Sequence, residues 1–199
     1  MISLDIETTG LDSATDTIVA IGCLDGARMD IISASVEEFK KSPQNAEKQI
    51  IDDFGSHLLT CNPDDVLLTY NGLSFDLPFI KHRAEKHGLW KKMAFLPETP
   101  HVDLFPFVHH AFGRRANKEE ACSKLANLYV PRKNDGMWIA RLYSHPELLT
   151  ENDHLDMLAH NATDISSTYK LYNVLKEFPD FQQWQLEQSK ISAKAEKGA

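Results

Sequence analysis

The first residues of the chain alternate between apolar and polar side chains. In the hexapeptide ISLDIE, residues 2–7, isoleucine and leucine alternate with serine, Asp5 and Glu7. Successive side chains of a strand point to opposite faces, so this spacing places both carboxylates on one face. Like charges at that distance repel each other, and burying either one without a partner is costly. The acidic face therefore meets water, or a positive group lies between the carboxylates.

The hydrophobic pattern predicts a mixed α/β protein. After residues 2–7, apolar runs predict strands at 17–24, 28–35, 66–70 and 101–105, with a tight hairpin at Asp25-Gly26 between the second and third. Helical spacing predicts helices at about 44–60, 76–88, 117–129, 136–149, 153–160 and 162–178, and a C-terminal helix from Phe181. We expect a five-stranded mixed sheet flanked by helices in residues 1–178, followed by a C-terminal helix and frayed tail in 179–199.

The composition is that of a soluble globular protein. The chain has 199 residues, of which 42% are hydrophobic, and no apolar run approaches the roughly 20 residues of a membrane span. A strand that starts at Ile2 leaves no room for a signal peptide. The three cysteines are scattered and form neither a disulfide framework nor a zinc pattern. These features predict a cytoplasmic protein with no membrane partner, and we expect a monomer.

The charge is unevenly distributed along the chain. The net charge is -8, but residues 1–70 carry -9 whereas residues 71–150 carry +4. Basic clusters lie at 81–83, 91–92, 114–115 and 132–133. They are consistent either with an ordinary solvated surface or with a local surface that binds phosphates despite the negative total.

Two further carboxylates lie beside apolar segments. Asp76 stands in TYNGLSFDLPFI, residues 69–80, where it either caps a helix or serves a site. Asp164 stands in HNATD, four residues after His160, so that a helix places both on one face. Asp164 is either a solvated or capping residue of a first helical turn or part of a site. No lysine or arginine stands next to any of the four carboxylates in the sequence, and such hard oxygen ligands suit Mg²⁺ or Mn²⁺.

SLDIETTG, YNGLSFDLPFI and HNATD, in this order and spacing, resemble the three exonuclease motifs of the DEDD superfamily of ribonuclease-H-like 3'–5' exonucleases. The second motif is most similar to the exonuclease domain of family B DNA polymerases and related stand-alone nucleases. The resemblance covers about residues 1–176. It implies a ribonuclease-H-like fold and hydrolysis of single-stranded nucleic acid from the 3' end, with DNA favoured over RNA.

The resemblance also implies how the carboxylates act. Asp5, Glu7, Asp76 and Asp164 would hold two divalent ions, Mg²⁺ or Mn²⁺, one activating the attacking water and the other stabilising the leaving oxygen. One subclass of the superfamily has a histidine five positions before the last aspartate, and the other has a tyrosine four positions before it. This sequence departs from both, because Ala159 is five positions before and His160 four. His160 is either the general base or a structural histidine.

Further positions of the motifs would contact the substrate strand. The resemblance assigns the turn of Thr8, Thr9 and Gly10 to the terminal nucleotide, although a plain loop fits these residues equally well. Leu11 would wedge against a base or, as is more usual, be buried. Asn71 would contact the strand, and Phe75 would either contact it or be ordinary core. For Asp103, a helix cap or a supporting role is favoured over metal binding.

Two other functions compete with the exonuclease. The first is a catalytically inactive nucleic-acid-binding or scaffold domain of the same fold, which the altered histidine spacing favours but the presence of all four acids does not. The second is a sugar-kinase-like or actin-like ATPase, whose first strand also carries an Asp before a Gly/Thr turn. Glu7 and the short chain argue against the second.

Overall fold

The computed structural model describes residues 1–62, 64–113, 117–127 and 136–187. The strands are β1 Ile2–Thr8, β2 Ile18–Asp25, β3 Arg28–Ser33, β4 Leu67–Thr69 and β5 His101–Asp103. The α-helices are α1 Val36–Lys41, α2 Pro43–Leu58, α3 Asp76–Lys86, α4 Phe105–Phe112, α5 Lys118–Ala126, α6 Gly136–Tyr143 and α7 Glu151–Leu175. Short 3-10 helices span Trp90–Met93 (η1), Leu96–Glu98 (η2) and Pro146–Leu148 (η3), and residues 179–187 are helical.

The five strands form one mixed sheet, as the hydrophobic pattern predicts. Its order is β3-β2-β1-β4-β5, with β1–β2 and β2–β3 antiparallel and β1–β4 and β4–β5 parallel. The predicted hairpin joins β2 to β3, with Asp25 opposite Arg28 and the intervening Gly26 at φ +57°. This is the five-stranded ribonuclease-H-like arrangement expected from the motifs.

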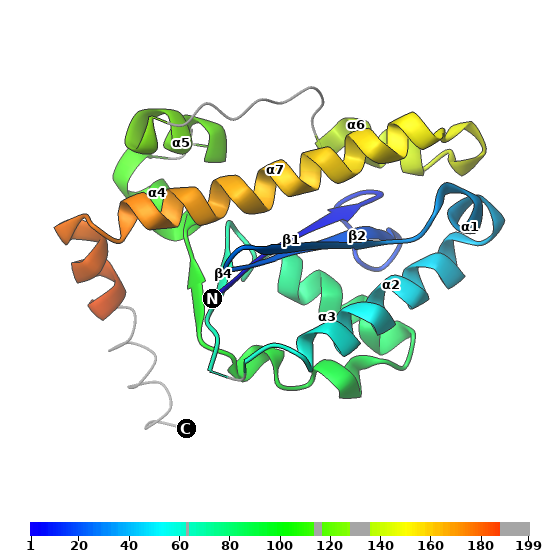
Figure 1. Cartoon of the computed structure of the whole chain (residues 1–199), viewed down its shortest axis with the longest axis horizontal. Helices are drawn as coiled ribbons and strands as arrows, with labels where there is room; N and C mark the ends of the chain where they lie inside the picture. Colours follow the sequence, from blue (N-terminus) through cyan, green and yellow to red (C-terminus); the bar gives the residue numbers. More distant parts are fainter. Residues whose placement is uncertain (63, 114–116, 128–135, 188–199) are drawn as a thin grey trace.

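Helices cover both faces of the sheet. Figure 1 shows α7 crossing one face and α2 and α3 lying against the other. The alternation in β1 matches these layers: Leu4 belongs to the core cluster with residues of α2 and α3, whereas Ser3 donates a hydrogen bond to the Ile165 carbonyl of α7. The polar face of β1 therefore lies under a helix and does not face open water.

Three features of the helices differ from the sequence prediction. The predicted helices at 153–160 and 162–178 are one continuous helix, α7, which starts at a capping box between Thr150 and Asp153 and ends at Leu175. The pattern appeared interrupted because His160, Asn161 and Asp164 put polar side chains where an apolar stripe was expected. The pattern also missed α1 and α4, which are short, and the predicted 136–149 helix ends at Tyr143 before η3.

The cysteines of the described residues are free thiols. Cys23 and Cys122 are buried free thiols, and Cys61 is a partly exposed one. No helix within the described ranges has the length and apolar character needed to cross a membrane. The predicted tail beyond residue 187 lies outside the described residues.

Candidate active site

The two carboxylates of β1 lie between the sheet and α7. Glu7 is buried and Asp5 is partly buried, and both face the helix whose Asn161 approaches them. A change of register between Glu7 and Thr8 ends the regular pairing of β1 with β2 at this point. Such irregularities re-aim side chains at the end of a strand.

Asp76 lies near this pair and comes from the start of α3. It is the first residue of α3 and is buried, and its Oδ1 accepts a hydrogen bond of 3.0 Å from the backbone N–H of Ile6. The residue at the cap position is Phe75, which has no side-chain capping bond. The alternative in which Asp76 caps the helix through its side chain is therefore wrong.

Asp164 and His160 come from the middle of α7. Both point toward β1, as their four-residue spacing predicts: His160 Nε2 lies 3.7 Å from Asp164 Oδ2 and 4.0 Å from Glu7 Oε1. Asp164 is buried and stands well inside a 25-residue helix, so the alternative of a solvated or first-turn aspartate is wrong. The structure thus places all four motif carboxylates and His160 near one another beside β1.

The carboxylates raise one another's proton affinity. The pKa of Glu7 is well above its ordinary value because of burial, followed by repulsion from Asp5 and Asp164. Burial and then repulsion from Asp5 likewise raise the pKa of Asp76, which the Ile6 N–H partly offsets. Concentrated negative charge of this kind requires a cation or a proton for balance.

Lys118, which the sequence analysis missed, supplies one such cation. It is the first residue of α5 and is buried, and its Nζ lies 3.3 Å from Asp164 Oδ2 and 3.6 Å from Asp5 Oδ1. Its charge also lowers the pKa of Glu7 and Asp76 relative to burial alone. No lysine is adjacent to the carboxylates in the sequence, but Lys118 contacts two of them in the folded protein.

Asn161 is a second residue without a sequence signal. Its Nδ2 donates to the Asp5 carbonyl and to Asp5 Oδ2, each at 3.3 Å, and to Glu7 Oε1 at 3.5 Å. It fits only because β2 carries Gly22 opposite it, where an added Cβ would lie 1.9 Å from Asn161 Oδ1. Asn161 and Gly22 therefore hold the two β1 carboxylates in position.

The donor set suits a divalent cation. Four carboxylates, three of them buried, offer hard oxygen ligands, and the ammonium between Asp5 and Asp164 marks a place where positive charge is stabilised. Within the described ranges, no group of three or more His, Cys, Asp or Glu side chains is gathered closely enough to hold a metal ion. The carboxylate ligands are of the kind that Mg²⁺ and Mn²⁺ prefer. Binding of an ion would require these side chains to move closer to one another.

The turn after β1 is held by its own side chains. Thr8 Oγ1 donates to the Gly10 carbonyl at 2.6 Å, and Thr9 Oγ1 accepts from the Thr17 N–H at 2.9 Å. A Cβ on Gly10 would lie 2.3 Å from Asp16 Oδ2, so a larger residue here requires the Asp16 side chain to move. Leu11 is 85% exposed. The expectation that Leu11 is buried is wrong, and its side chain projects from the turn beside the carboxylates.

The turn after β4 depends on Asp103. Asp103 Oδ1 accepts from the N–H of Asn71 at 2.7 Å and of Phe105 at 3.0 Å, and Oδ2 accepts from Leu73 N–H at 3.0 Å. It thus supports Asn71, which adopts a left-handed φ of +73°, and the start of α4. Phe75 is partly buried and packs on the core near Phe79, with ring centroids 5.5 Å apart.

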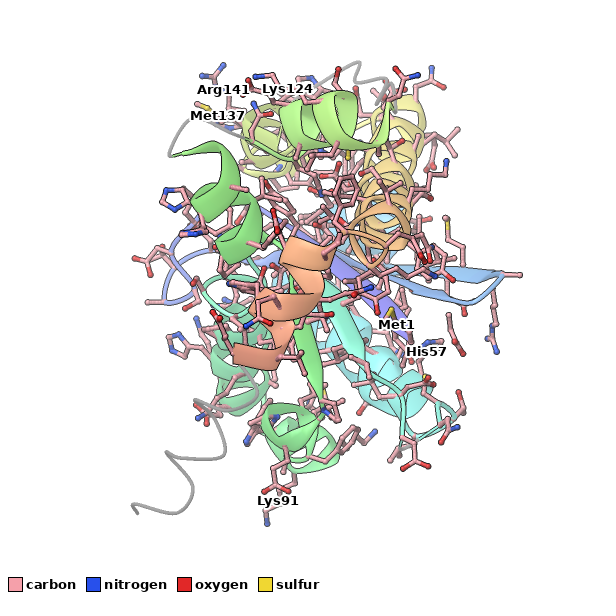
Figure 2. The ribbon with its side chains drawn as sticks, turned by 90° about the vertical axis from the view of Figure 1, so that its left-hand side faces the viewer. Met1, His57, Lys91, Lys124, Met137 and Arg141 are labelled. Carbon is pink, nitrogen blue, oxygen red and sulfur yellow. The ribbon has the colours of Figure 1, made fainter. Side chains whose placement is uncertain are left out.

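One residue of the described basic clusters is buried. Arg83 is buried and bonded to Glu47 at 2.5–2.7 Å, so it is a structural residue and its assignment to a phosphate-binding surface is wrong. Figure 2 shows Lys91 at the end of the molecule opposite Lys124 and Arg141. The clusters at 114–115 and 132–133 lie outside the described residues.

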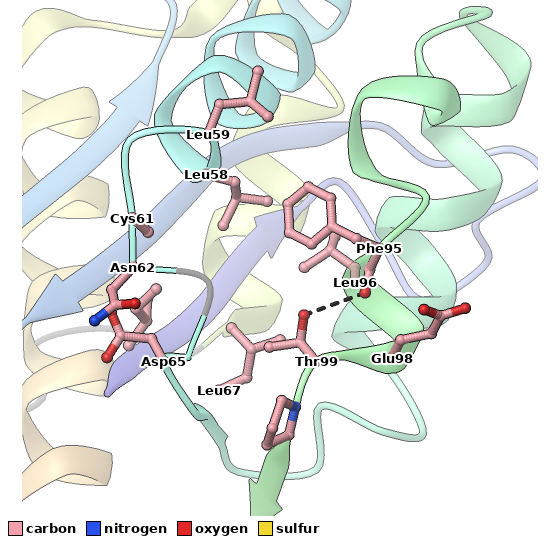
Figure 3. A pocket seen from close by; sticks show the side chains of 12 residues that line it. Leu58, Leu59, Cys61, Asn62, Asp65, Leu67, Phe95, Leu96, Glu98 and Thr99 are labelled. Atoms are coloured by element: carbon pink, nitrogen blue, oxygen red, sulfur yellow. Dashed lines mark hydrogen bonds between the residues drawn. The ribbon is translucent and has the colours of Figure 1, made fainter.

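Two hollows differ in character. One, of about 460 Å³, is lined mainly by apolar side chains such as Leu58 and Phe95 and opens at the amino ends of β1 and β4 (Figure 3). The carboxylates lie toward the other end of these strands. A shallower hollow of about 230 Å³ between α6 and η3 is lined by Trp138, Arg141 and His145, among others.

Comparisons with known proteins agree with this geometry. A family model described as RNase_H superfamily matches residues 2–176. The DNA polymerase epsilon catalytic subunits A of Kluyveromyces lactis and Saccharomyces cerevisiae are 28% and 29% identical to the chain over 86% of its length. The chain spans only 9% of each of these relatives.

A solved structure shows the same fold. The family B DNA polymerase from the hyperthermophilic archaeon Pyrobaculum calidifontis superposes with a TM-score of 0.69 at 17% identity, over 87% of this chain and 24% of the polymerase. The expected likeness to a family B DNA polymerase is therefore confirmed at the level of the fold.

Proposed function

Because this chain belongs to the RNase H superfamily, we propose that it is a 3'–5' exonuclease that hydrolyses single-stranded nucleic acid, with DNA favoured over RNA. The observation that carries the proposal is the convergence of Asp5, Glu7, Asp76 and Asp164 beside His160, at the end of the parallel strands.

In this proposal the four carboxylates hold divalent cations, Mg²⁺ or Mn²⁺. When bound, such ions lower the pKa of water and stabilise a leaving oxyanion. The proposed ligands are Asp5 and Asp164, which both contact Lys118, and Glu7 and Asp76. Burial, and then repulsion from neighbouring carboxylates, raises the pKa of Glu7 and Asp76. Asn161 keeps the Asp5 and Glu7 side chains oriented toward the site.

His160 is proposed as the general base. It stands within 4.0 Å of carboxylates on both β1 and α7, so a water among these groups lies within its reach. The water oxygen forms a bond to phosphorus, the bond from phosphorus to the 3'-oxygen breaks, and His160 accepts the proton of the water. A nucleoside 5'-monophosphate leaves, and the 3'-oxygen of the shortened strand takes up a proton from solvent to give a free 3'-hydroxyl.

The substrate strand is proposed to run past the two turns of the site. The turn of Thr8, Thr9 and Gly10 offers backbone and hydroxyl groups, and the exposed Leu11 offers an apolar contact to a base. Asn71, held by Asp103, and Phe75 border the site from the β4 side. Aromatic faces and cations are the usual means of holding a single strand without sequence preference.

The proposal is tested with 5'-labelled single-stranded DNA and RNA of identical sequence, incubated with the protein and Mn²⁺ or Mg²⁺. We expect a ladder that shortens from the 3' end, faster on DNA, and that disappears with EDTA and in Asp5→Ala. Asp53→Ala, which removes an exposed carboxylate of α2, is the matched control and keeps the activity. Salt-sensitive binding without shortening would instead assign the chain to nucleic-acid binding.

A further inference from the structure

Lys118 occupies the position between two proposed metal ligands from opposite layers. Its ammonium contacts Asp5 of β1 at 3.6 Å and Asp164 of α7 at 3.3 Å, and both carboxylates are largely shielded from water. Lys118 is the first residue of α5, a helix that packs on α7. This contact is therefore part of the packing and is not a chance meeting of long surface side chains.

An ammonium and a divalent cation compete for the same oxygens. Mg²⁺ needs carboxylate oxygens at about 2.0–2.1 Å, which is closer than either oxygen lies to the lysine nitrogen. A site filled by the lysine cannot accept an ion at that place, because two positive charges would share the same ligands at short range. The described carboxylates are also not gathered as a metal would require.

We propose that Lys118 is a built-in substitute for one divalent cation, which neutralises the carboxylates in the metal-free protein and must be displaced when the metal binds. The proposal rests on the proposed function, since it assigns the metal to the same carboxylates. It adds a competitor that belongs to the chain itself and that sets the affinity for the metal.

The ammonium also has a neighbour that attracts cations and is not a proposed metal ligand. Its nitrogen already lies 5.8 Å from the centre of the Tyr70 ring, whose face attracts cations. The four-carbon stem of lysine is flexible enough for the ammonium to move while α5 stays in place. The exchange therefore requires a change of side-chain conformation and no rearrangement of the fold.

The test is the Mn²⁺ affinity of the metal-free full chain, measured by calorimetry and by the electron paramagnetic resonance signal of free Mn²⁺. Three variants are compared with the wild type: Lys118→Met, Lys118→Arg and Lys124→Met. Methionine keeps an unbranched stem and removes the charge, and arginine keeps the charge. Lys124 lies on the same helix but is exposed and pairs with Glu120, so it serves as the matched control.

We expect Lys118→Met to bind Mn²⁺ about tenfold more tightly or better, which corresponds to about 1.4 kcal/mol. Lys124→Met keeps the wild-type affinity, and Lys118→Arg binds no more tightly than the wild type. Without metal, Lys118→Met melts at a lower temperature than the wild type, and Mn²⁺ reverses this loss. If Lys118→Met fails to fold without metal, Mn²⁺ restores its circular dichroism spectrum.

Equal or weaker Mn²⁺ binding by Lys118→Met would overturn the inference, as would a metal-free variant that Mn²⁺ fails to stabilise. Failure of the proposed function has a different signature. If the wild type and Lys118→Met both lack Mn²⁺ binding and DNA shortening, both proposals fall. If the wild type binds Mn²⁺ and shortens DNA while Lys118→Met gains no affinity, only the role of Lys118 is refuted.

Discussion

At the scale of single residues, the candidate site is a balance of charge. Glu7 and Asp76 are buried next to other carboxylates, an arrangement that raises their pKa values and costs free energy when they ionise. Small polar contacts offset part of this cost: the Ile6 N–H on Asp76 and the Asn161 amide on Asp5 and Glu7. Each contact orients a carboxylate as well as stabilising its charge.

Gly22→Ala tests the orienting role of Asn161. The new methyl group would lie 1.9 Å from Asn161 Oδ1, so the amide must move away from Asp5 and Glu7. We expect a loss of about 1–3 kcal/mol in the free energy of unfolding, measured with urea, and a loss of nuclease activity larger than instability explains at a temperature where the variant stays folded.

Gly136→Ala is the control for this change, because among the described residues no atom outside its own chain neighbours lies within 4 Å of its added Cβ. It should leave both stability and activity close to those of the wild type. A Gly22→Ala protein with unchanged activity would show that the Asn161 contacts do not position the carboxylates.

The sequence predicts the site residues to different degrees, for a physical reason. Asp5 and Glu7 stand out because strand alternation is local, and His160 and Asp164 because helical spacing is local. Lys118 and Asn161 carry no such signal, since their partners are set by how α5 and α7 pack on β1. Leu11 was expected inside because leucine usually is, yet the turn directs it outward.

At the scale of elements, a buried ion pair connects helices α2 and α3 to each other and to strand β2. Glu47 of α2 accepts hydrogen bonds from Arg83 of α3 and from the N–H of Ile18 at the start of β2. Arg83 also donates to the Ser13 carbonyl at 3.2 Å, in the turn that follows the β1 carboxylates. Sequence patterns presented Arg83 as part of a basic surface because its partner is distant along the chain.

Arg83→Met tests this connection. Removing the guanidinium leaves Glu47 charged and buried with fewer partners, so we expect a loss of about 3–5 kcal/mol in the free energy of unfolding, measured with urea. The exposed Lys81 of the same helix lies 4.0 Å from Glu85 and 5.8 Å from the centre of the Trp90 ring, and Lys81→Met should cost less than about 1 kcal/mol. Equal costs for both variants would contradict the role given to Arg83.

The contact between α6 and α7 predicts a dependence on pH. His154 of α7 is buried, and its Nδ1 lies 2.8 Å from the Tyr143 hydroxyl oxygen. Burial lowers the pKa of His154 in the folded protein below the ordinary value of 6.5, which it has in the unfolded chain. Between these two pKa values the unfolded chain binds more protons than the folded one, so this residue's contribution to stability falls as the pH drops below about 6.5.

His154→Gln should therefore reduce the loss of stability between about pH 7.5 and pH 5.5, measured by urea unfolding at each pH. His145→Gln, which changes an exposed histidine near the same helices, is the control variant. If His154→Gln and the wild type lose the same stability over this range, the histidine contributes nothing to it.

At the scale of the whole molecule, the candidate site lies toward the carboxyl end of β1, and the mainly apolar hollow lies at the amino ends of β1 and β4. The order β3-β2-β1-β4-β5 brings Asp5 and Glu7 of β1 next to Asp76, which follows β4, and α7 closes the site with Asp164. The order of strands and motifs predicts this arrangement. The continuity of α7 was not predictable from periodicity, because the site itself interrupts the apolar stripe.

The most direct measurement compares the wild type with Asp76→Asn for release of the 3'-terminal nucleotide from single-stranded DNA in Mn²⁺, together with the melting temperature of each protein without metal. Asparagine can still accept the hydrogen bond of Ile6, and it removes a buried, repelled charge. The account predicts a rate lower by at least about 100-fold in a protein that melts no lower than the wild type. Release at the wild-type rate by Asp76→Asn would contradict it.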